Sequence, residues 1–266
     1  MPPSREATAP QPPPEKSEKL VTVLVTGFGP FLHKFPVNSS WSIASTLPSI
    51  IPATKAHPIP IHIIVHHEPI RVAYKSVLDV VPPLLSNICP EPDIVLHIGL
   101  STGRTFYTLE KGAHRIGYGA IADVDGYHFT DEEAKKQWPN LPSVLKTGFK
   151  TEDVWQRLRK ELSHLDVDVR PSEDAGNFLC GFIYYTSMAE YYKLSEKERP
   201  VIFLHVPDLP TKDKLDQGRE IACALIRALV ESNKHFGAGN STEENSDGEH
   251  IPGIRQETDA NFSEVT

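Results

Sequence analysis

Residues 20–26 read L-V-T-V-L-V-T, an apolar run that ends at Gly27 and is typical of a buried β-strand. Similar runs occur at 93–98 (D-I-V-L-H-I), closed by Gly99, and at 201–206 (V-I-F-L-H-V). A fourth strand-like segment covers 59–65. These four runs are the candidate strands of one sheet.

Helical patterns separate the candidate strands. They cover residues 39–47, 72–85, 151–162, 175–192 and 213–235. The second is expected to end at its two prolines, and the Thr-Glu-Asp start at 151 has the pattern of a capping box. Strands that alternate with helices predict an α/β sheet covered on both faces.

Composition limits the class of protein. The 266 residues are 39% hydrophobic and 23% charged, enough for one large domain. A net charge of -8 argues against nucleic-acid and anionic-membrane partners, which bind through clustered Lys and Arg. With three cysteines and neither an apolar leader nor a long apolar run, we expect a cytoplasmic protein.

The two ends of the chain differ from its middle. Residues 1–19 are rich in Pro, Glu and Lys, and residues 237–266 are polar and acidic. Such segments bury too little apolar surface to offset the entropy of ordering them. We therefore expect two disordered tails around a single domain at 20–236.

Three predicted strands are followed by short segments with polar or aromatic residues. These are T-G-F-G-P-F at 26–31, G-L-S-T-G-R at 99–104 and H-V-P-D-L-P at 205–210. Open α/β sheets place their sites at the carboxyl ends of strands. The chemistry is therefore expected in these loops.

A cysteine and a histidine are the candidate reacting groups. Cys180 lies near the start of a predicted helix, where a thiolate and an oxyanion would both be stabilised. His205 interrupts an apolar strand and is the candidate base. A carboxylate should orient its imidazole, and Glu110, Asp174 and Asp208 all compete for that role.

Four motifs, in this order, resemble the pyroglutamyl peptidase I family. They are T-G-F-G-P-F with V-N-S-S-W at 37–41, the run G-L-S-T-G-R-T-F-Y-T-L-E-K-G-A-H-R-I-G-Y at 99–118, D-A-G-N-F-L-C at 174–180, and F-L-H-V-P-D-L-P at 203–210. The resemblance covers about 21–227, and the T-L-E-K-x-x-H-x-x-G-Y stretch is more like the eukaryotic branch.

The resemblance implies a three-layer α/β/α sandwich around a twisted mixed sheet. It also implies a cysteine omega-peptidase that removes N-terminal pyroglutamate through a Glu110–Cys180–His205 triad, without a metal or cofactor. N-terminally blocked peptides are its expected partners, and a homo-oligomer is possible in this family. Phe28, Phe31 and Asn38 match substrate-pocket positions.

The chain also departs from the family pattern. Leu100 replaces a Gln found in some bacterial members, Gly181 replaces an Asn, and Ala120 occupies the position of an active-site Arg. Arg104 is our candidate for a replacement contact to the substrate, with Arg115 as the other choice.

Two other functions stay open at this point. The departures are compatible with a catalytically weak member that binds N-blocked peptides. Alternatively, I-H-I-I-V-H-H-E at 61–68 could supply His62, His66 and His67 to a metal-dependent hydrolase. A phosphatase loop of the C-x5-R type is excluded, because position 186 is Thr.

Overall fold

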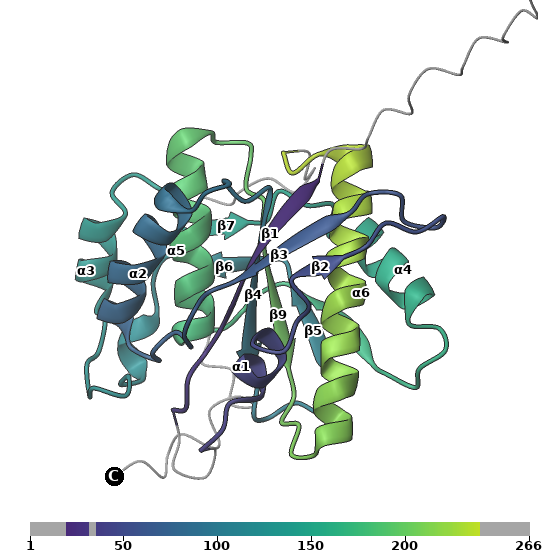
Figure 1. Ribbon diagram of the computed structural model, residues 1–266. Coiled ribbons are helices and arrows are strands. Elements are labelled where there is room, and N and C mark those ends of the chain that lie inside the picture. Colours follow the sequence, from purple (N-terminus) through teal and green to yellow (C-terminus); the bar gives the residue numbers. More distant parts are fainter. Residues whose placement is uncertain (1–19, 32–35, 240–266) are drawn as a thin grey trace, which may run out of the picture.

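A seven-stranded sheet runs through the centre of the computed structural model, which describes residues 20–31 and 36–239 (Figure 1). The strand order is β2 (Ile50–Ile51), β3 (Ile61–Val65), β1 (Val21–Gly27), β4 (Ile94–Leu100), β9 (Val201–Val206), β5 (Tyr107–Glu110) and β8 (Val169–Ser172). The four predicted strands are β1, β3, β4 and β9, and all four are confirmed.

The central strands β3, β1, β4 and β9 are parallel to one another. Of these, β1, β4 and β9 are buried on both faces, which explains their nearly continuous apolar sequences. β2 is antiparallel to β3, whereas β5 is antiparallel to β9 and parallel to β8. The sheet is therefore mixed, as the family resemblance implies.

Helices cover the two faces of the sheet and form the expected three layers (Figure 1). One layer contains α1 (Ser39–Ala44), α4 (Thr151–Glu161) and α6 (Lys212–Phe236). The other contains α2 (Tyr74–Asn87), α3 (Asp131–Gln137) and α5 (Leu179–Leu194). The antiparallel strands β6 (Gly112–His114) and β7 (Val144–Lys146) and the 3-10 turn η1 (Tyr118–Ala120) belong to the same layer.

The two halves of the core differ in composition. The α1–α4–α6 side is mainly aliphatic, and Val23 and Val25 of β1 pack there. The opposite side receives Leu24 and is rich in aromatic rings. At its centre Phe182 of α5 lies 4.7 Å from Phe129 and 5.4 Å from Trp138, measured between ring centroids. This packed aromatic cluster supports α5 from behind.

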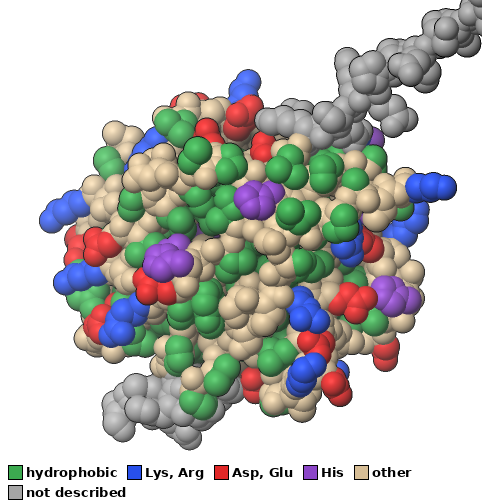
Figure 2. Space-filling model, viewed as in Figure 1, with side chains coloured by type: hydrophobic (Ala, Val, Ile, Leu, Met, Phe, Trp, Pro, Cys, Tyr) green, Lys and Arg blue, Asp and Glu red, His purple; other side chains and the backbone are tan. Residues whose placement is uncertain are grey.

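The surface between these elements is mixed in charge. On the face drawn in Figure 2, acidic and basic side chains lie beside one another, and hydrophobic side chains are interspersed among them. Within the described residues, no helix is both long and apolar enough to cross a membrane.

Two helices differ from the sequence prediction. Helix α2 continues through Pro82 and Pro83, because burial of one apolar face against α5 outweighs the loss of two N–H donors. The predicted capping box at Thr151 is wrong, since Lys150 is the N-cap and makes no side-chain bond. The capping box of the described chain lies at Thr130 and Glu133 instead.

The predicted tails fall almost wholly outside the described residues. Residues 1–19 and 240–266 are not described, so their predicted disorder stays a prediction. Residues 237–239 are described, and the Arg199 N–H donates to the carbonyl of Ala238 at 3.1 Å. The last described residues therefore lie against the body of the domain.

Gly27, at the end of β1, should be the most demanding position of the first loop. A Cβ there would lie 2.8 Å from the Ser40 carbonyl oxygen and 2.9 Å from the Trp41 Cα, both of them backbone atoms of α1. We expect Gly27→Ala to lower the unfolding free energy by about 1–3 kcal/mol, and thermal denaturation measures this. Gly29→Ala is the control, because its Cβ would meet nothing closer than 3.6 Å. Equal midpoints for the two variants would contradict the prediction.

Candidate active site

The three loops singled out in the sequence meet at one edge of the sheet. They follow β1, β4 and β9, which are adjacent parallel strands. The Ser101 N–H donates to the Val206 carbonyl at 2.8 Å and so joins the second and third loops. The Leu209 N–H donates to Ser39 Oγ at 3.0 Å and ties the third loop to α1.

Cys180 is the second residue of α5, because the helix begins at Leu179, four residues later than predicted. Residues 175–178 do not join the helix, because Gly176 has a φ of 85° and its N–H is held by Asp174 Oδ1 at 3.0 Å. The N-cap, Phe178, makes no side-chain cap. The N–H groups of residues 179–181 lie in the first turn, where the helix offers them no partner.

Two glycines permit this placement of the thiol. A Cβ on Gly99 of β4 would lie 2.8 Å from Cys180 Sγ, so a side chain there would displace the sulfur. A Cβ on Gly181 would lie 1.9 Å from the carbonyl oxygen of Gly176. The loop before α5 therefore packs on the first helical turn more closely than any side chain at position 181 would allow.

His205 lies between the thiol and a buried carboxylate. Its Nδ1 is 2.7 Å from Glu110 Oε1, and its imidazole is also within hydrogen-bonding reach of Cys180. Burial disfavours the charged imidazolium, but the interactions with Cys180 and Glu110 outweigh it and raise the pKa of His205 to about 9. The Nδ1–H is thus donated to Glu110, and Nε2 is left to exchange protons.

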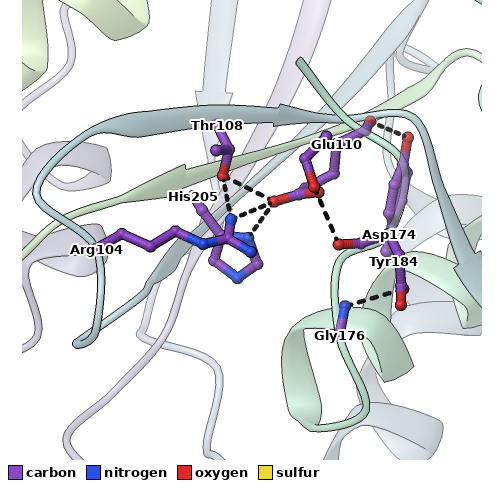
Figure 3. A network of polar contacts seen from close by, with 8 residues as sticks. Arg104, Thr108, Glu110, Asp174, Gly176, Tyr184 and His205 are labelled. Atoms are coloured by element: carbon purple, nitrogen blue, oxygen red, sulfur yellow. Dashed lines mark hydrogen bonds and ion pairs between the residues drawn. The ribbon is translucent and has the colours of Figure 1, made fainter. Parts of the chain in front are cut away.

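Glu110 is held by three donors on one oxygen (Figure 3). Besides His205, Arg104 Nη1 donates to Oε1 at 2.9 Å and Thr108 Oγ1 donates at 2.8 Å. The Glu110 side chain is fully buried, and burial alone would raise its pKa. His205 and Arg104 outweigh that effect and lower the pKa of Glu110 to about 2.

Among the three candidate carboxylates, Glu110 is the one that contacts His205. Asp174 Oδ2 lies 3.5 Å from His114 Nε2, and Asp208 is exposed. No strand was predicted at the position of β5, yet β5 is the strand that brings Glu110 to His205. Its antiparallel pairing with β9 sets Thr108 opposite His205 and Glu110 opposite Phe203.

Arg104 contacts the carboxylate of the site. Its guanidinium donates to Glu110 and Thr108, and its expected contact to the substrate stays a prediction. Arg115 donates to the Leu141 carbonyl, and Ala120 is exposed at the end of η1. Leu100 is buried, with 6% of its surface exposed.

The residues expected to bind substrate have different surroundings. Phe28 is 2% exposed and belongs to the aromatic half of the core, whereas Phe31 is only partly buried. Asn38 caps α1, accepts from the Ser40 N–H, and donates to the Gly29 carbonyl at 2.9 Å. It therefore braces the first loop.

A further aromatic residue was missed in the sequence. The Phe178 ring lies 6.5 Å from the Phe31 ring, centroid to centroid, with an angle of 46° between the rings. Both side chains are partly exposed, and Phe178 is two residues before Cys180. The sequence signal for Phe178 is its place two residues before the candidate nucleophile.

The histidines of the alternative metal site do not form one. Within residues 20–31 and 36–239, no group of three or more His, Cys, Asp or Glu side chains could hold a metal ion. His66 Nδ1 instead lies 2.7 Å from the Glu68 carbonyl oxygen, and the exposed His67 pairs with the Glu68 carboxylate at 3.6 Å. The prediction of a site at His62, His66 and His67 is therefore wrong.

Comparison with known proteins gives consistent matches. A family model described as pyroglutamyl peptidase matches residues 21–232. Human pyroglutamyl-peptidase 1 is 31% identical over 213 residues, which is 79% of this chain and 88% of the relative. Pyrrolidone-carboxylate peptidase of Bacillus subtilis is 28% identical over 209 residues, 78% of this chain and 88% of the relative.

Solved structures agree in fold. The pyrrolidone carboxyl peptidase of Thermococcus litoralis superimposes with a TM-score of 0.64 at 20% identity, over 84% of this chain and 100% of that one. The enzyme of the same name from Thermus thermophilus gives a TM-score of 0.58 at 27% identity, over 79% and 99%.

Replacing Glu110 by Gln should lower the pKa of His205, because the carboxylate that favours the imidazolium is lost. NMR titration of the imidazole measures the change. A raised folded-state pKa stabilises the protein below the unfolded-state value near 6.5 and loses that effect as pH rises through about 9. Between pH 6.5 and about 9, the unfolding free energy of Glu110→Gln should therefore fall less than that of the wild type.

The matched control is Glu173→Gln, which removes an exposed carboxylate paired with Lys111. It should leave the titration of His205 unchanged. An unchanged pKa of His205 in Glu110→Gln would show that Glu110 does not set its charge.

Proposed function

The chain belongs to the pyroglutamyl peptidase family of cysteine peptidases, and we propose that Cys180, His205 and Glu110 are the residues with which it removes N-terminal pyroglutamate from peptides. The observation that carries the assignment is the contact chain from the thiol through His205 to Glu110, with 2.7 Å between His205 Nδ1 and Glu110 Oε1. A nucleophile, a base and an orienting acid in series are what covalent acyl transfer requires.

The first half of the reaction forms a thioester. Cys180 Sγ, as the thiolate of a pair with protonated His205, attacks the pyroglutamyl carbonyl carbon. The N–H groups at the start of α5 stabilise the resulting oxyanion. His205 then gives its proton to the departing amine, the C–N bond breaks, and the shortened peptide leaves.

The second half releases the acid. Neutral His205 takes a proton from water, and the hydroxide adds to the thioester carbonyl. The C–S bond breaks, free pyroglutamate departs, and the Cys180 thiolate is restored beside protonated His205. The same imidazole thus serves first as acid and then as base.

Arg104 acts in this scheme as a positioning residue. Its guanidinium and the Thr108 hydroxyl both donate to the oxygen that accepts from His205. Their hydrogen bonds keep Glu110 ionised, so that the carboxylate orients the imidazolium without taking its proton.

The pyroglutamyl ring is flat and carries no charged amine, so aromatic surface is suited to bind it. We assign this role to Phe31 and Phe178, whose partly exposed rings are 6.5 Å apart beside Cys180. Phe28 would support the loop from within the core. The complete contact chain favours turnover over a role as a peptide-binding protein without catalysis.

We propose a cytoplasmic location, because the mechanism requires a reduced thiol. Cys89, Cys180 and Cys223 are all free thiols, which a reducing compartment preserves. Assembly into a homo-oligomer is likewise a proposal, drawn from the family resemblance.

Cys180→Ser should reduce kcat for a chromogenic pyroglutamyl amide at least about 1,000-fold while the protein stays folded, because a serine hydroxyl is not ionised here. Cys89→Ser and Cys223→Ser are the controls. Cys89 is exposed, and the half-buried Cys223 lies on α6. Both should keep kcat, and substantial turnover by Cys180→Ser would overturn the assignment.

Phe31→Ala and Phe28→Ala should separate binding from packing. Phe31→Ala should raise KM for the pyroglutamyl amide with little change in thermal midpoint, because it removes a partly exposed ring. Phe28→Ala should instead lower the unfolding free energy by about 3–5 kcal/mol, because it empties a core position. Steady-state kinetics and thermal denaturation of both variants test this, and the reverse pattern would exchange the two roles.

A further inference from the structure

Ser101 carries a hydroxyl group that none of the contacts described above explains. The residue is 6% exposed, and its Oγ is buried with no hydrogen-bond partner among the described residues. A buried hydroxyl without a partner costs about 1–3 kcal/mol. Such a group calls for a ligand that completes its hydrogen bonding.

The position of Ser101 in the sheet places this hydroxyl on the side of the reacting thiol. Successive side chains of a strand point to opposite faces. In β4, His97 reaches Ser187 of α5 at 2.8 Å, and Gly99 faces Cys180 Sγ. Ile98 between them packs in the other half of the core.

Ser101 is two residues beyond Gly99, so it continues the face that carries Cys180. Its N–H bond to the Val206 carbonyl keeps the backbone in line with β9 at this point. His205 pairs in register with Gly99, and its ring lies 4.7 Å from that of Phe203, which lies against Gly99 as Cys180 does. Ser101 and His205 therefore share one face at the carboxyl edge of the sheet.

The neighbouring loops indicate which part of a substrate lies above Ser101. β4 lies between β1, whose loop carries Phe31, and β9, which carries His205. The reacting carbonyl must lie at the thiol and the first-turn N–H groups of α5. The ring attached to that carbonyl then extends toward Phe31, over the end of β4.

We propose that the Ser101 hydroxyl hydrogen-bonds to the lactam amide of the pyroglutamyl ring and so helps to select this ring over rings without that amide. The inference rests on the proposed function and deepens it. A hydroxyl can donate to the lactam C=O or accept from its N–H, and both groups are absent from a carbocyclic ring. A site that holds a polar group in this way discriminates strongly against analogues that lack it.

Two non-reacting competitors isolate this contact. The first, 5-hydroxymethyl-2-pyrrolidinone, has the lactam, whereas cyclopentylmethanol has a ring of the same size without it. Ser101→Ala should weaken inhibition by the lactam about 10-fold and leave inhibition by cyclopentylmethanol unchanged. It should also lower kcat/KM for a pyroglutamyl amide about 10-fold, mainly through KM, without lowering the thermal midpoint.

Ser101→Cys provides a second variant of similar volume with a weak donor, and it should show an intermediate loss. Thr102→Ala, at the next, partly exposed residue, is the matched control and should behave as the wild type. An unchanged ratio of the two inhibition constants in Ser101→Ala would overturn the inference, as would a loss of kcat alone, which would place the hydroxyl at the oxyanion.

The outcome also separates this inference from the proposed function. If the wild type turns over pyroglutamyl amides and Ser101→Ala still distinguishes the lactam from cyclopentylmethanol equally well, only the role of Ser101 is refuted. A wild-type protein without such turnover refutes both.

Discussion

The buried contact between Glu110 and His205 is the interaction around which this protein is organised. A carboxylate with no exposed surface would be costly alone, and here His205, Arg104 and Thr108 all donate to the same oxygen. That arrangement requires β5 to run antiparallel beside β9, at the point where the sheet departs from its parallel centre. The mixed topology is therefore part of how the site is built.

The nucleophile is positioned by a different kind of constraint. Cys180 comes from α5, and α5 is fixed from behind by the aromatic cluster around Phe182. In front, Gly99 allows the thiol to approach the sheet. The aromatic cluster therefore fixes α5 on one side, and the lack of a side chain at Gly99 leaves room for the sulfur on the other. Together they hold the sulfur near His205.

Much of the fold could be predicted from the sequence, because β1, β4 and β9 are buried on both faces and are mostly apolar. Residues 201–206 were predicted to be a strand and form β9 within the same bounds. The strands β5 and β8 have four residues each, and their mixed sequences carry no periodic signal. The prolines of α2 misled the prediction, since local propensity says nothing about the packing that overrides it.

The candidate site was predictable in part. Cys180 and His205 stood out from their apolar surroundings, whereas Glu110 could be preferred over Asp174 and Asp208 only through the family resemblance. The contact of Arg104 with Glu110 could not be foreseen, because it depends on how the loop after β4 folds back over β5. Phe28 and Phe31 looked equivalent in the sequence, and only burial distinguishes them.

The contact between Arg199 and Ala238 extends the packed domain beyond its last helix. Ala238 lies beyond the last turn of α6, yet its carbonyl accepts from the Arg199 N–H. Its oxygen also occupies the space beside Gly148, where a Cβ would overlap it at 1.4 Å. Trimming the chain back to the helix would uncover the backbone just before β9, the strand that carries His205. A truncation that ends at Ala238 therefore keeps this contact, whereas one that ends at Phe236 removes it.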